Sequence, residues 1–265
     1  YYGQLQEEGD VDYWRYEFTP VEEKGEDLQM APRLWPSWGM DTWGFEMALY
    51  NGDNEKVAWT DAPGYDAYGG NWYPDTGIMY WATAGETYYL EVSSNNDSYG
   101  TGTFYPGFDA YYYTPEDEEL ETESNDTCDR ADTIELAESE STPGYYYGAL
   151  YATLDGDDVS DCFRLRADDI GSLEGMYLSA YVQGADLGSL LDAKITIYGD
   201  ETAESILAEA SYSPDTEAGD PQVWDLTLGS DDDVYVQVDA EAQGTSETSN
   251  YYYIVLKAYD EPINE

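Results

Sequence analysis

Residues 121–126, ETESND, place four carboxylate or amide side chains close together, those of Glu121, Glu123, Asn125 and Asp126. An acidic run containing a proline precedes them, and Cys128 and an alternating apolar stretch follow. These groups repel one another unless water or a cation lies among them, and a calcium ion takes roughly six to eight oxygen ligands. We therefore expect a second acidic segment to fold back onto residues 121–126.

On both sides of this segment, short runs alternate apolar and polar residues, are rich in Tyr, Trp, Val and Thr, and are separated by turn residues. This alternation predicts β-strands and an all-β fold. The expected strands of the first half lie within residues 12–18, 43–50, 85–92 and 108–113. The one stretch that suggests a helical turn or two is residues 202–210.

The second half repeats the first in the same order. The sequence YGAL at residues 147–150 is similar to YGQL at residues 2–5. In both halves an expected strand that begins with an acidic Gly-Asp pair follows. Repeats of this kind predict tandem copies of one fold. We expect two jelly-roll-like antiparallel β-sandwiches at residues 1–115 and 121–259, joined by an acidic linker at residues 116–120.

The two copies differ at their starts. The second begins with a leading segment, residues 121–136, which has no counterpart in the first, so the first sandwich is expected to lack its opening strand. The tail, residues 260–265 (DEPINE), looks like the start of another leading segment and includes Glu261 and Asn264. An unpaired sheet edge is usually covered. Three explanations stay open: a clipped or incomplete chain, a neighbour's segment that fills the slot by strand addition, or a shorter sandwich.

The charge excludes several classes of partner. The chain of 265 residues has 58 Asp and Glu against 9 Lys and Arg, a formal charge of −49. Nucleic acid needs clustered cations, which this chain lacks, and anionic membrane would repel it. No apolar run reaches the ~20 residues of a membrane helix. The acidity suits a solvated surface at high salt, and bound divalent cations would relieve part of the repulsion.

Cys128 and Cys162 are the two cysteines, and they fit one disulfide; with no histidine in the chain they make a poor zinc site. A disulfide and an acidic surface together indicate a location outside the cytoplasm. The chain does not open with a basic segment followed by an apolar one, so we expect any signal peptide to have been removed.

Five motifs resemble the bacterial pre-peptidase C-terminal domain family: the leading Glu-x-Asn-Asp, Gly…Asp-x-Asp-aromatic, Asp-x-x-Ile-x-Ile-Tyr, Gly-x-x-Tyr-Tyr-x-x-Val and a Tyr-rich last strand. They occur in this order in two copies, more completely in the second. The resemblance implies small jelly-roll-like sandwiches attached to secreted peptidases and other surface proteins. The similar collagen-binding domains of clostridial collagenases bind Ca²⁺ through a leading acidic segment and an Asp-x-x-Asp loop.

Carried over by position, the resemblance implies a calcium site in the second copy, whose ligands would be Glu121, Glu123, Asn125, Asp126, Asp158 and Asp161. Cys162 stands where the family usually has an aromatic residue, so a bond to Cys128 would clamp the same two segments. In the first copy only Asp10 and Asp12 match the acidic loop. A complete site there would need oxygens from another segment, such as Glu261 and Asn264.

Catalysis has little support in the sequence. Without histidine, the usual general base and the Ser-His and Cys-His pairs are absent, and among 58 acidic residues a pair of carboxylates is uninformative. The 29 Tyr and 8 Trp are expected mostly in the core and in cross-strand pairs. One cluster lies partly in expected loops, where exposed rings would stack on sugars or contact another subunit: Trp35, Trp38, Trp43, Trp59, Trp72 and Tyr73.

These observations favour a secreted, non-catalytic structural subunit. Two Ca²⁺-stabilised sandwiches would assemble head to tail with copies of the same chain into an extracellular filament or surface layer by strand complementation. The alternative is an accessory binding module of a larger secreted enzyme, which would adhere to protein or polysaccharide through residues such as Trp35 or Trp72.

Overall fold

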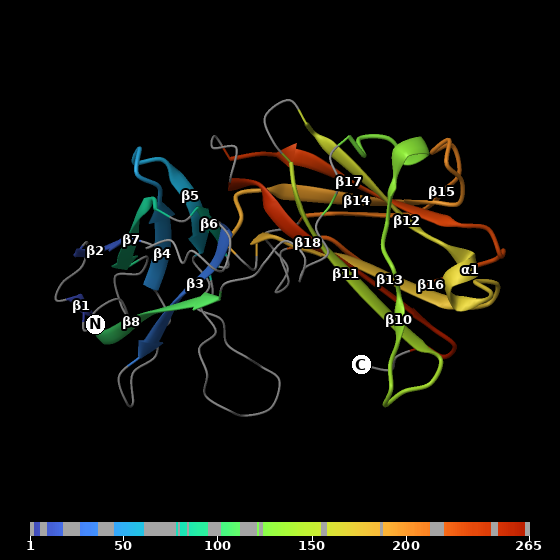
Figure 1. The fold of residues 1–265 in the computed structure, drawn as a ribbon, viewed down its shortest axis with the longest axis horizontal. Helices are drawn as coiled ribbons and strands as arrows, with labels where there is room; N and C mark the ends of the chain where they lie inside the picture. Colours follow the sequence, from blue (N-terminus) through green and yellow to red (C-terminus); the bar gives the residue numbers. More distant parts are fainter. Residues whose placement is uncertain are drawn as a thin grey trace. The chain divides into compact units, whose positions relative to one another are not determined.

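The computed structural model describes residues 3–5, 10–17, 27–36, 45–60, 78, 80–83, 85–94, 102–111, 121, 124–154, 158–185, 188–212, 220–244 and 249–262. These residues form β-strands almost throughout, as the alternating sequence predicts (Figure 1). The structure divides into two compact units. The first comprises Tyr1–Asp117, Ala185–Leu190 and Gly244–Ser249, and the second comprises Glu118–Gly184, Leu191–Gln243 and Asn250–Glu265.

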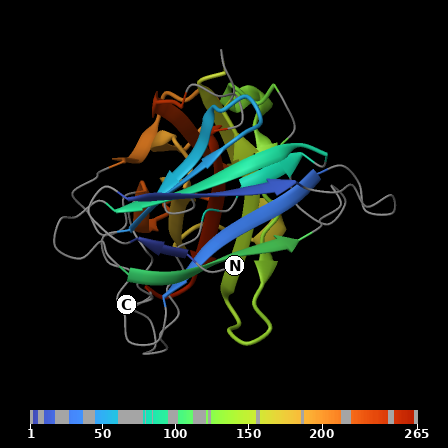
Figure 2. The ribbon, with the colours of Figure 1, turned by 90° about the vertical axis from the view of Figure 1, so that its left-hand side faces the viewer.

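The first unit contains the strands β1 (Gly3–Leu5), β2 (Val11–Glu17), β3 (Asp27–Pro36), β4 (Phe45–Tyr50), β5 (Lys56–Thr60), β6 (Tyr80–Thr83), β7 (Thr87–Ser94) and β8 (Gly102–Tyr111). They make two four-stranded antiparallel sheets, in the orders β1-β8-β3-β6 and β2-β7-β4-β5. These strands are coloured blue to green in Figures 1 and 2.

The second unit opens with a 3₁₀ turn, η1 (Cys128–Arg130), and two short strands, β9 (Asp132–Thr133) and β10 (Ala137–Glu138). The remaining elements are β11 (Tyr145–Thr153), β12 (Ser160–Leu165), α1 (Ala167–Ile170), β13 (Tyr177–Gln183), β14 (Asp192–Tyr198), β15 (Ile206–Ser211), β16 (Gln222–Thr227), β17 (Val234–Ala242) and β18 (Tyr251–Tyr259). They make two five-stranded sheets, β10-β11-β18-β13-β16 and β15-β14-β17-β12-β9. All pairings are antiparallel except that of β9 with β12.

The two units have the same strand order and connections. β1 to β8 correspond one to one to β11 to β18, and each pairing in the first unit, such as β1 with β8, recurs in the second, as β11 with β18. The two additional strands of the second unit, β9 and β10, come from the leading segment and lie at the edges beside β12 and β11. In the described part of the first unit no strand takes their place. Two tandem β-sandwiches are therefore confirmed, and within the described residues the first has no counterpart of the opening strand.

The core of the second unit consists of the alternate inward side chains of both sheets. Phe163 and Leu165 of β12 meet Tyr252, Ile254 and Leu256 of β18, all of them fully buried. This alternation with a period of two is the expected result of pleated strands with one apolar face. Burial of these side chains stabilises the sandwich by roughly 1.5–3 kcal/mol for each large apolar group.

The expected helical turn at residues 202–210 is wrong. Residues Ile206–Ser211 form β15, the edge strand beside β14, with Ile195 paired to Ala210. The described part of the chain has one short α-helix elsewhere, α1, which directly follows β12. Good helix formers in residues 202–210 were overridden by pairing with a neighbouring strand.

Candidate functional site

The leading segment of the second unit lies along β12. The Cys162 N–H donates to the Asn125 carbonyl at 2.8 Å, and the Ile134 N–H donates to the Arg164 carbonyl at 3.0 Å. The segment therefore occupies the open side of this strand twice, once before and once after η1. The Glu121 N–H donates a hydrogen bond to the Tyr151 carbonyl of β11 at 3.1 Å, so the same segment contacts both sheets.

A disulfide joins Cys128 to Cys162, as predicted, with Cα atoms 5.1 Å apart. Both residues are buried on the side of β12 that faces away from the main core, where they pack with Tyr235. The bond fixes the leading segment to β12 next to Asp161. The two segments that carry the predicted acidic clusters are thus covalently connected.

Asp161 and Tyr252 form a buried pair between the two sheets. The Tyr252 hydroxyl donates to Asp161 Oδ2 at 2.6 Å, and both residues are 0% exposed. Burial, followed by the negative charges of Asp161 and Glu121, raises the pKa of the Tyr252 hydroxyl well above its usual range. Asp158 adds to the same effect. The acidic groups of the leading segment and of the Asp-x-x-Asp loop therefore act on one buried hydroxyl.

Asn125 supplies an amide to this region. It is 1% exposed, and neither its Oδ1 nor its Nδ2 has a hydrogen-bond partner among the described residues. The buried Oγ of Ser160 also has none. Buried polar atoms are nearly always hydrogen-bonded or bound to water or an ion. These atoms fit a site that takes a cation or an ordered water.

The structure brings some of the predicted calcium ligands together but not all of them. Glu121, Asn125, Asp158 and Asp161 come together as described, and the Glu121 carboxylate also accepts bonds from the N–H and hydroxyl of Thr153. Asp126 is exposed, and Glu123 lies outside the described residues. Among those described, no three acidic side chains are positioned to hold one metal ion together. Calcium also accepts amide and backbone oxygens, so the chemistry of the groups fits a hard cation, with oxygens beyond these carboxylates completing its shell.

Tyr252 was missed by the sequence analysis. It stands in the inward register of β18 together with Ile254 and Leu256, and a tyrosine in a core needs a partner for its hydroxyl. That requirement is the signal that could have paired it with a buried acid. The partner, Asp161, is 91 residues away in the sequence, so the register of two strands in different sheets was needed to find it.

The first unit has only part of this arrangement. Its strand β2 carries Asp12, which is half-buried, and Asp10 lies just before the strand. Of the predicted contact residues, Trp35 lies in β3 and Glu261 is exposed after β18. Trp38, Trp43, Trp72, Tyr73 and Asn264 lie outside the described residues.

Tyrosines form cross-strand stacks on the face of the second unit's sheet that points away from its core. The Tyr259 ring lies between those of Tyr145 and Tyr177, with centroids 6.2 Å and 6.1 Å away. Nearby, Tyr181 stacks on Trp224 at 5.7 Å, and the Lys257 ammonium lies 5.0 Å from the Tyr181 ring. The expected cross-strand aromatic pairs are therefore present. Stacking and cation–π contacts each add of order 1 kcal/mol.

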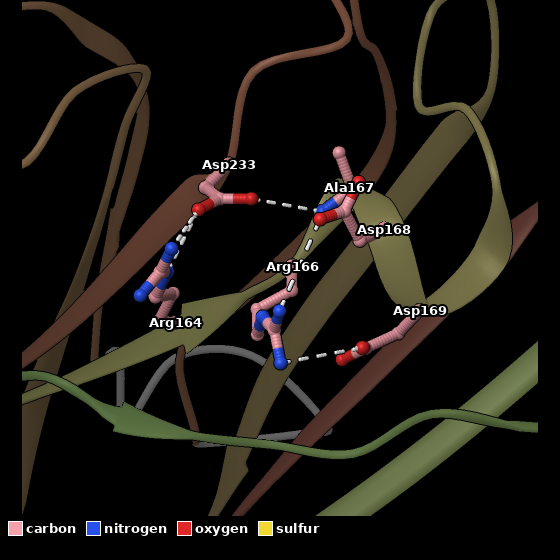
Figure 3. Close-up of polar contacts among 6 residues, drawn as sticks. All are labelled: Arg164, Arg166, Ala167, Asp168, Asp169 and Asp233. Carbon is pink, nitrogen blue, oxygen red and sulfur yellow. Dashed lines mark hydrogen bonds and ion pairs between the residues drawn. The ribbon is translucent and has the colours of Figure 1, made fainter.

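The C-terminal end of β12 is held by an ion pair at the start of α1 (Figure 3). Arg164 donates through Nε and Nη2 to Asp233 Oδ2, and the Ala167 N–H donates to Oδ1 of the same carboxylate. Partial burial opposes ionisation of Asp233, but the Ala167 and Arg164 hydrogen bonds outweigh it and lower the pKa of this carboxyl. In the same view, Arg166 lies near Asp168 and Asp169. The charges here are paired, which indicates a structural role.

The fold and the site together define a tandem β-sandwich protein with a disulfide-clamped leading segment in its second unit. No family model matches the chain, and no curated protein shows significant similarity to it. In the described part of the chain, no helix has the length and apolar character needed to cross a membrane.

Several solved structures are similar to the chain at low level. The CUB1-EGF-CUB2 domains of human MASP-1/3 share 9% identity at a TM-score of 0.24, covering 97% of this chain and 99% of that one. The CBM22-1-CBM22-2 tandem domain of Paenibacillus barcinonensis Xyn10C shares 7% identity at a TM-score of 0.25, covering 97% and 93%. A partial N-terminal region of an enterococcal surface protein shares 9% identity at a TM-score of 0.20, covering 92% and 86%. Scores this low carry no argument, so the fold assignment rests on the strand order of the chain itself.

Proposed function

We propose that this chain is a secreted, non-catalytic structural subunit that assembles head to tail with copies of itself by strand complementation, into a filament or surface layer. One observation carries the proposal: eight strands with the same connections occur twice, and among the described residues only the second set has the additional edge strands β9 and β10. Open sheet edges pair readily with a further chain, and strand addition is a common mode of association.

The assembly is tested by sedimentation velocity of the purified chain over a range of concentrations, with calcium or with EDTA, and by electron microscopy of the same samples. We expect oligomers that grow with concentration and form linear arrays. A chain that stays monomeric at high concentration in the presence of calcium would overturn the proposal.

Calcium is proposed to stabilise the second unit. The support is the meeting of Glu121, Asp158 and Asp161 around Tyr252, together with the buried amide of Asn125, which has no partner among the described residues. If bound there, the ion would draw on these carboxylate and amide oxygens and relieve their mutual repulsion. Because it binds the folded form, it raises stability by RT ln(1 + [L]/Kd).

Terbium luminescence tests this site, because a lanthanide near a tyrosine is sensitised by its ring. We expect sensitised emission that calcium displaces, and loss of that emission in Asp161→Asn. Asp129→Asn is the matched control, since Asp129 is exposed on the same leading segment. Unchanged emission in Asp161→Asn would place the ion elsewhere and remove the calcium proposal.

The second candidate function is an accessory module that adheres to polysaccharide or protein. It is favoured by Tyr147 and Trp224, which are 46% and 42% exposed in the two sheet strands β11 and β16. Aromatic rings on a sheet face are a common platform for ligands with apolar faces. Binding to a glycan or collagen array that is lost in Trp224→Ala, and retained in Ile206→Ala, would favour this function over the structural one.

A further inference from the structure

Three central strands of one sheet in the second unit differ in charge from the rest of the chain. β11, β13 and β18 contain no acidic residue, although 58 of the 265 residues of the chain are acidic. In the other sheet, β12, β14, β15 and β17 each contain at least one. The one charged side chain of the three central strands is that of Lys257. A strongly acidic molecule therefore has one sheet that is nearly free of charge.

The pairing registers align side chains in a row across the outer face of this sheet, where β11, β18, β13 and β16 lie side by side (Figure 1). Tyr147 of β11 lies opposite Lys257 of β18, which in turn lies opposite Ser179 of β13. β16 continues the row with Trp224 and Asp225. Three spacings between neighbouring strands make the row roughly 14 Å long. It therefore suits an extended ligand that runs across the strands.

A β-bulge presents two side chains at one end of this row. The pairing of β13 with β16 shifts by one position, so that Ser179 alone lies opposite both Trp224 and Asp225. Both of these side chains are exposed, whereas a regular strand would place a single outward side chain there. Asp225 has a φ of 52°, a left-handed conformation that few residues other than glycine adopt. Bulges and strained backbone of this kind are concentrated at functional sites.

Buried hydroxyl groups hold the bulge in place. The Asp225 N–H donates to Ser179 Oγ at 3.2 Å, and the Tyr259 hydroxyl donates to Asp225 Oδ1. Ser179 and Tyr259 are also hydrogen-bonded to each other, and they are 0% and 3% exposed. The other carboxylate oxygen of Asp225, Oδ2, accepts no hydrogen bond among the described residues. The network thus fixes an exposed acceptor beside the Trp224 ring.

Trp224 and Lys257 add an apolar surface and hydrogen-bond donors. The Trp224 side chain is 42% exposed although Tyr181 stacks on its ring. The Lys257 ammonium lies 5.5 Å from the centre of the Trp224 ring. None of the ion pairs among the described residues includes Lys257, and an ammonium group has three N–H donors. An aromatic ring, a set of donors and an acceptor therefore meet at one end of the row.

The charges indicate which kind of ligand fits this site. The net charge of −49 repels polyanions, and the opposite charges of Lys257 and Asp225 leave the site close to neutral. A protein partner would cover roughly 800 Å², whereas the large apolar side chains exposed on this sheet, among the described residues, are those of Tyr147 and Trp224. A neutral sugar ring has an apolar face of C–H groups and a rim of hydroxyls, which match an aromatic ring flanked by a few polar groups.

We propose that this row on the outer face of the second unit binds a neutral polysaccharide, with one sugar ring stacked on Trp224 and its hydroxyls bonded to Lys257 and Asp225. Tyr147, at the other end of the row, contacts a sugar further along the same polymer. The inference rests on the second candidate function, adhesion, and specifies its site and ligand class; it is independent of the proposed assembly. Because the row is longer than one sugar ring, an oligosaccharide binds more tightly than a single sugar.

Affinity electrophoresis in native gels tests the site with the full chain. The gels contain hydroxyethylcellulose, arabinoxylan, galactomannan or dextran as neutral polymers, and polygalacturonate without added calcium as the polyanionic control. Binding slows the migration of the chain, and the dependence on polymer concentration gives a dissociation constant. We expect at least one neutral polymer to slow the chain and polygalacturonate not to. For the polymer that binds, Trp224→Ala raises the dissociation constant at least tenfold.

Further variants separate the contributions to binding. Thr227→Ala is the matched control, because Thr227 is exposed on the same strand, and it should leave the dissociation constant unchanged. Trp224→Tyr keeps an aromatic ring and should recover most of the binding that Trp224→Ala loses. Lys257→Met and Asp225→Asn should each weaken binding several-fold; asparagine tolerates the left-handed conformation and keeps an oxygen for Tyr259. Circular dichroism and thermal unfolding verify that each variant is folded.

Failure of all four neutral polymers to slow the chain, binding to polygalacturonate instead, or equal binding by Trp224→Ala and the unsubstituted chain would overturn the inference. If a polymer binds independently of Trp224, adhesion stands at another surface and the inference fails. If no polymer binds and Trp224→Ala abolishes self-association in sedimentation velocity, this face is a contact between copies and the inference also fails. If a polymer binds through Trp224 and the chain stays monomeric, the inference stands and the proposed assembly fails.

Discussion

Removing the disulfide is expected to lower the stability of the second unit by an amount that follows from its place in the chain. The perturbation is the double variant Cys128→Ala/Cys162→Ala. The bonded residues are 34 apart, and the chain-entropy relation for a loop of this length gives about 4 kcal/mol at 25 °C. With a urea m value of about 2 kcal/mol/M, the unfolding midpoint falls by about 2 M.

The assay is urea unfolding followed by hydrogen exchange in peptides from β17 (Val234–Ala242), which report the second unit alone. Peptides from β7 (Thr87–Ser94) of the first unit are the internal control and are expected to keep their midpoint. The unsubstituted chain under reducing conditions keeps both sulfur atoms, so it separates the effect of the cross-link from that of lost packing.

A second result is expected from the same samples. Without the cross-link, residues 128–138 should exchange faster than the strands on which they lie, because hydrogen bonds alone then hold the leading segment. A midpoint shift below about 0.5 M in β17, or an equal shift in both units, would refute the reasoning, since the bond would then not act as a clamp on this unit.

Three further perturbations test other parts of the second unit. Gly148→Ala should destabilise it by roughly 1–3 kcal/mol, because the new methyl group meets the Glu135 carbonyl, and thermal unfolding measures the loss; an unchanged melting temperature would contradict this contact. Tyr252→Phe removes the hydroxyl that donates to Asp161 and should cost about 1.5–3 kcal/mol in urea unfolding at neutral pH; a neutral effect would refute the pair's structural role. The lowered pKa of Asp233 means that its contribution is present above the carboxyl's usual range of about 4 and is lost as the pH falls through the lower folded value. Asp233→Asn should therefore flatten the acid side of the stability profile, and a profile as steep as that of the unsubstituted chain would count against this.

The tandem fold and its asymmetry were predictable because both rest on local signals that occur twice. Residues 3–5 of the first Tyr-Gly-x-Leu run lie in β1 and residues 147–150, the second run, lie in β11, and these two strands pair with the corresponding strands β8 and β18. The leading segment has no partner in the first half, and that difference alone predicted the missing strand. Residues 202–210 were misread because their composition suits a helix, whereas the edge of β14 dictates a strand.

The site was only partly predictable. The acidic leading segment indicated that a second acidic cluster would fold back onto it, and the family resemblance implied that this cluster is the loop at Asp158 and Asp161; the shift in the pKa of Tyr252 reflects both. The position of the Tyr252 hydroxyl depends on the inward register of β18, and this strand is far from both acidic segments in the sequence. Trp14 of β2 is half-buried, whereas the ring of Phe163 in β12 is fully buried, and no pattern within residues 11–17 expresses this difference.

The first unit is not a continuous piece of polypeptide. Ala185–Leu190 and Gly244–Ser249 belong to it by their contacts, and the Trp59 N–H of β5 donates to the Gly188 carbonyl at 2.8 Å. Anyone who dissects this molecule at residue 117 would therefore obtain an N-terminal fragment whose β5 margin has lost a native backbone partner. Self-association measured on this fragment would then include contacts made by the newly exposed edge of β5, in addition to any contacts that the intact chain makes.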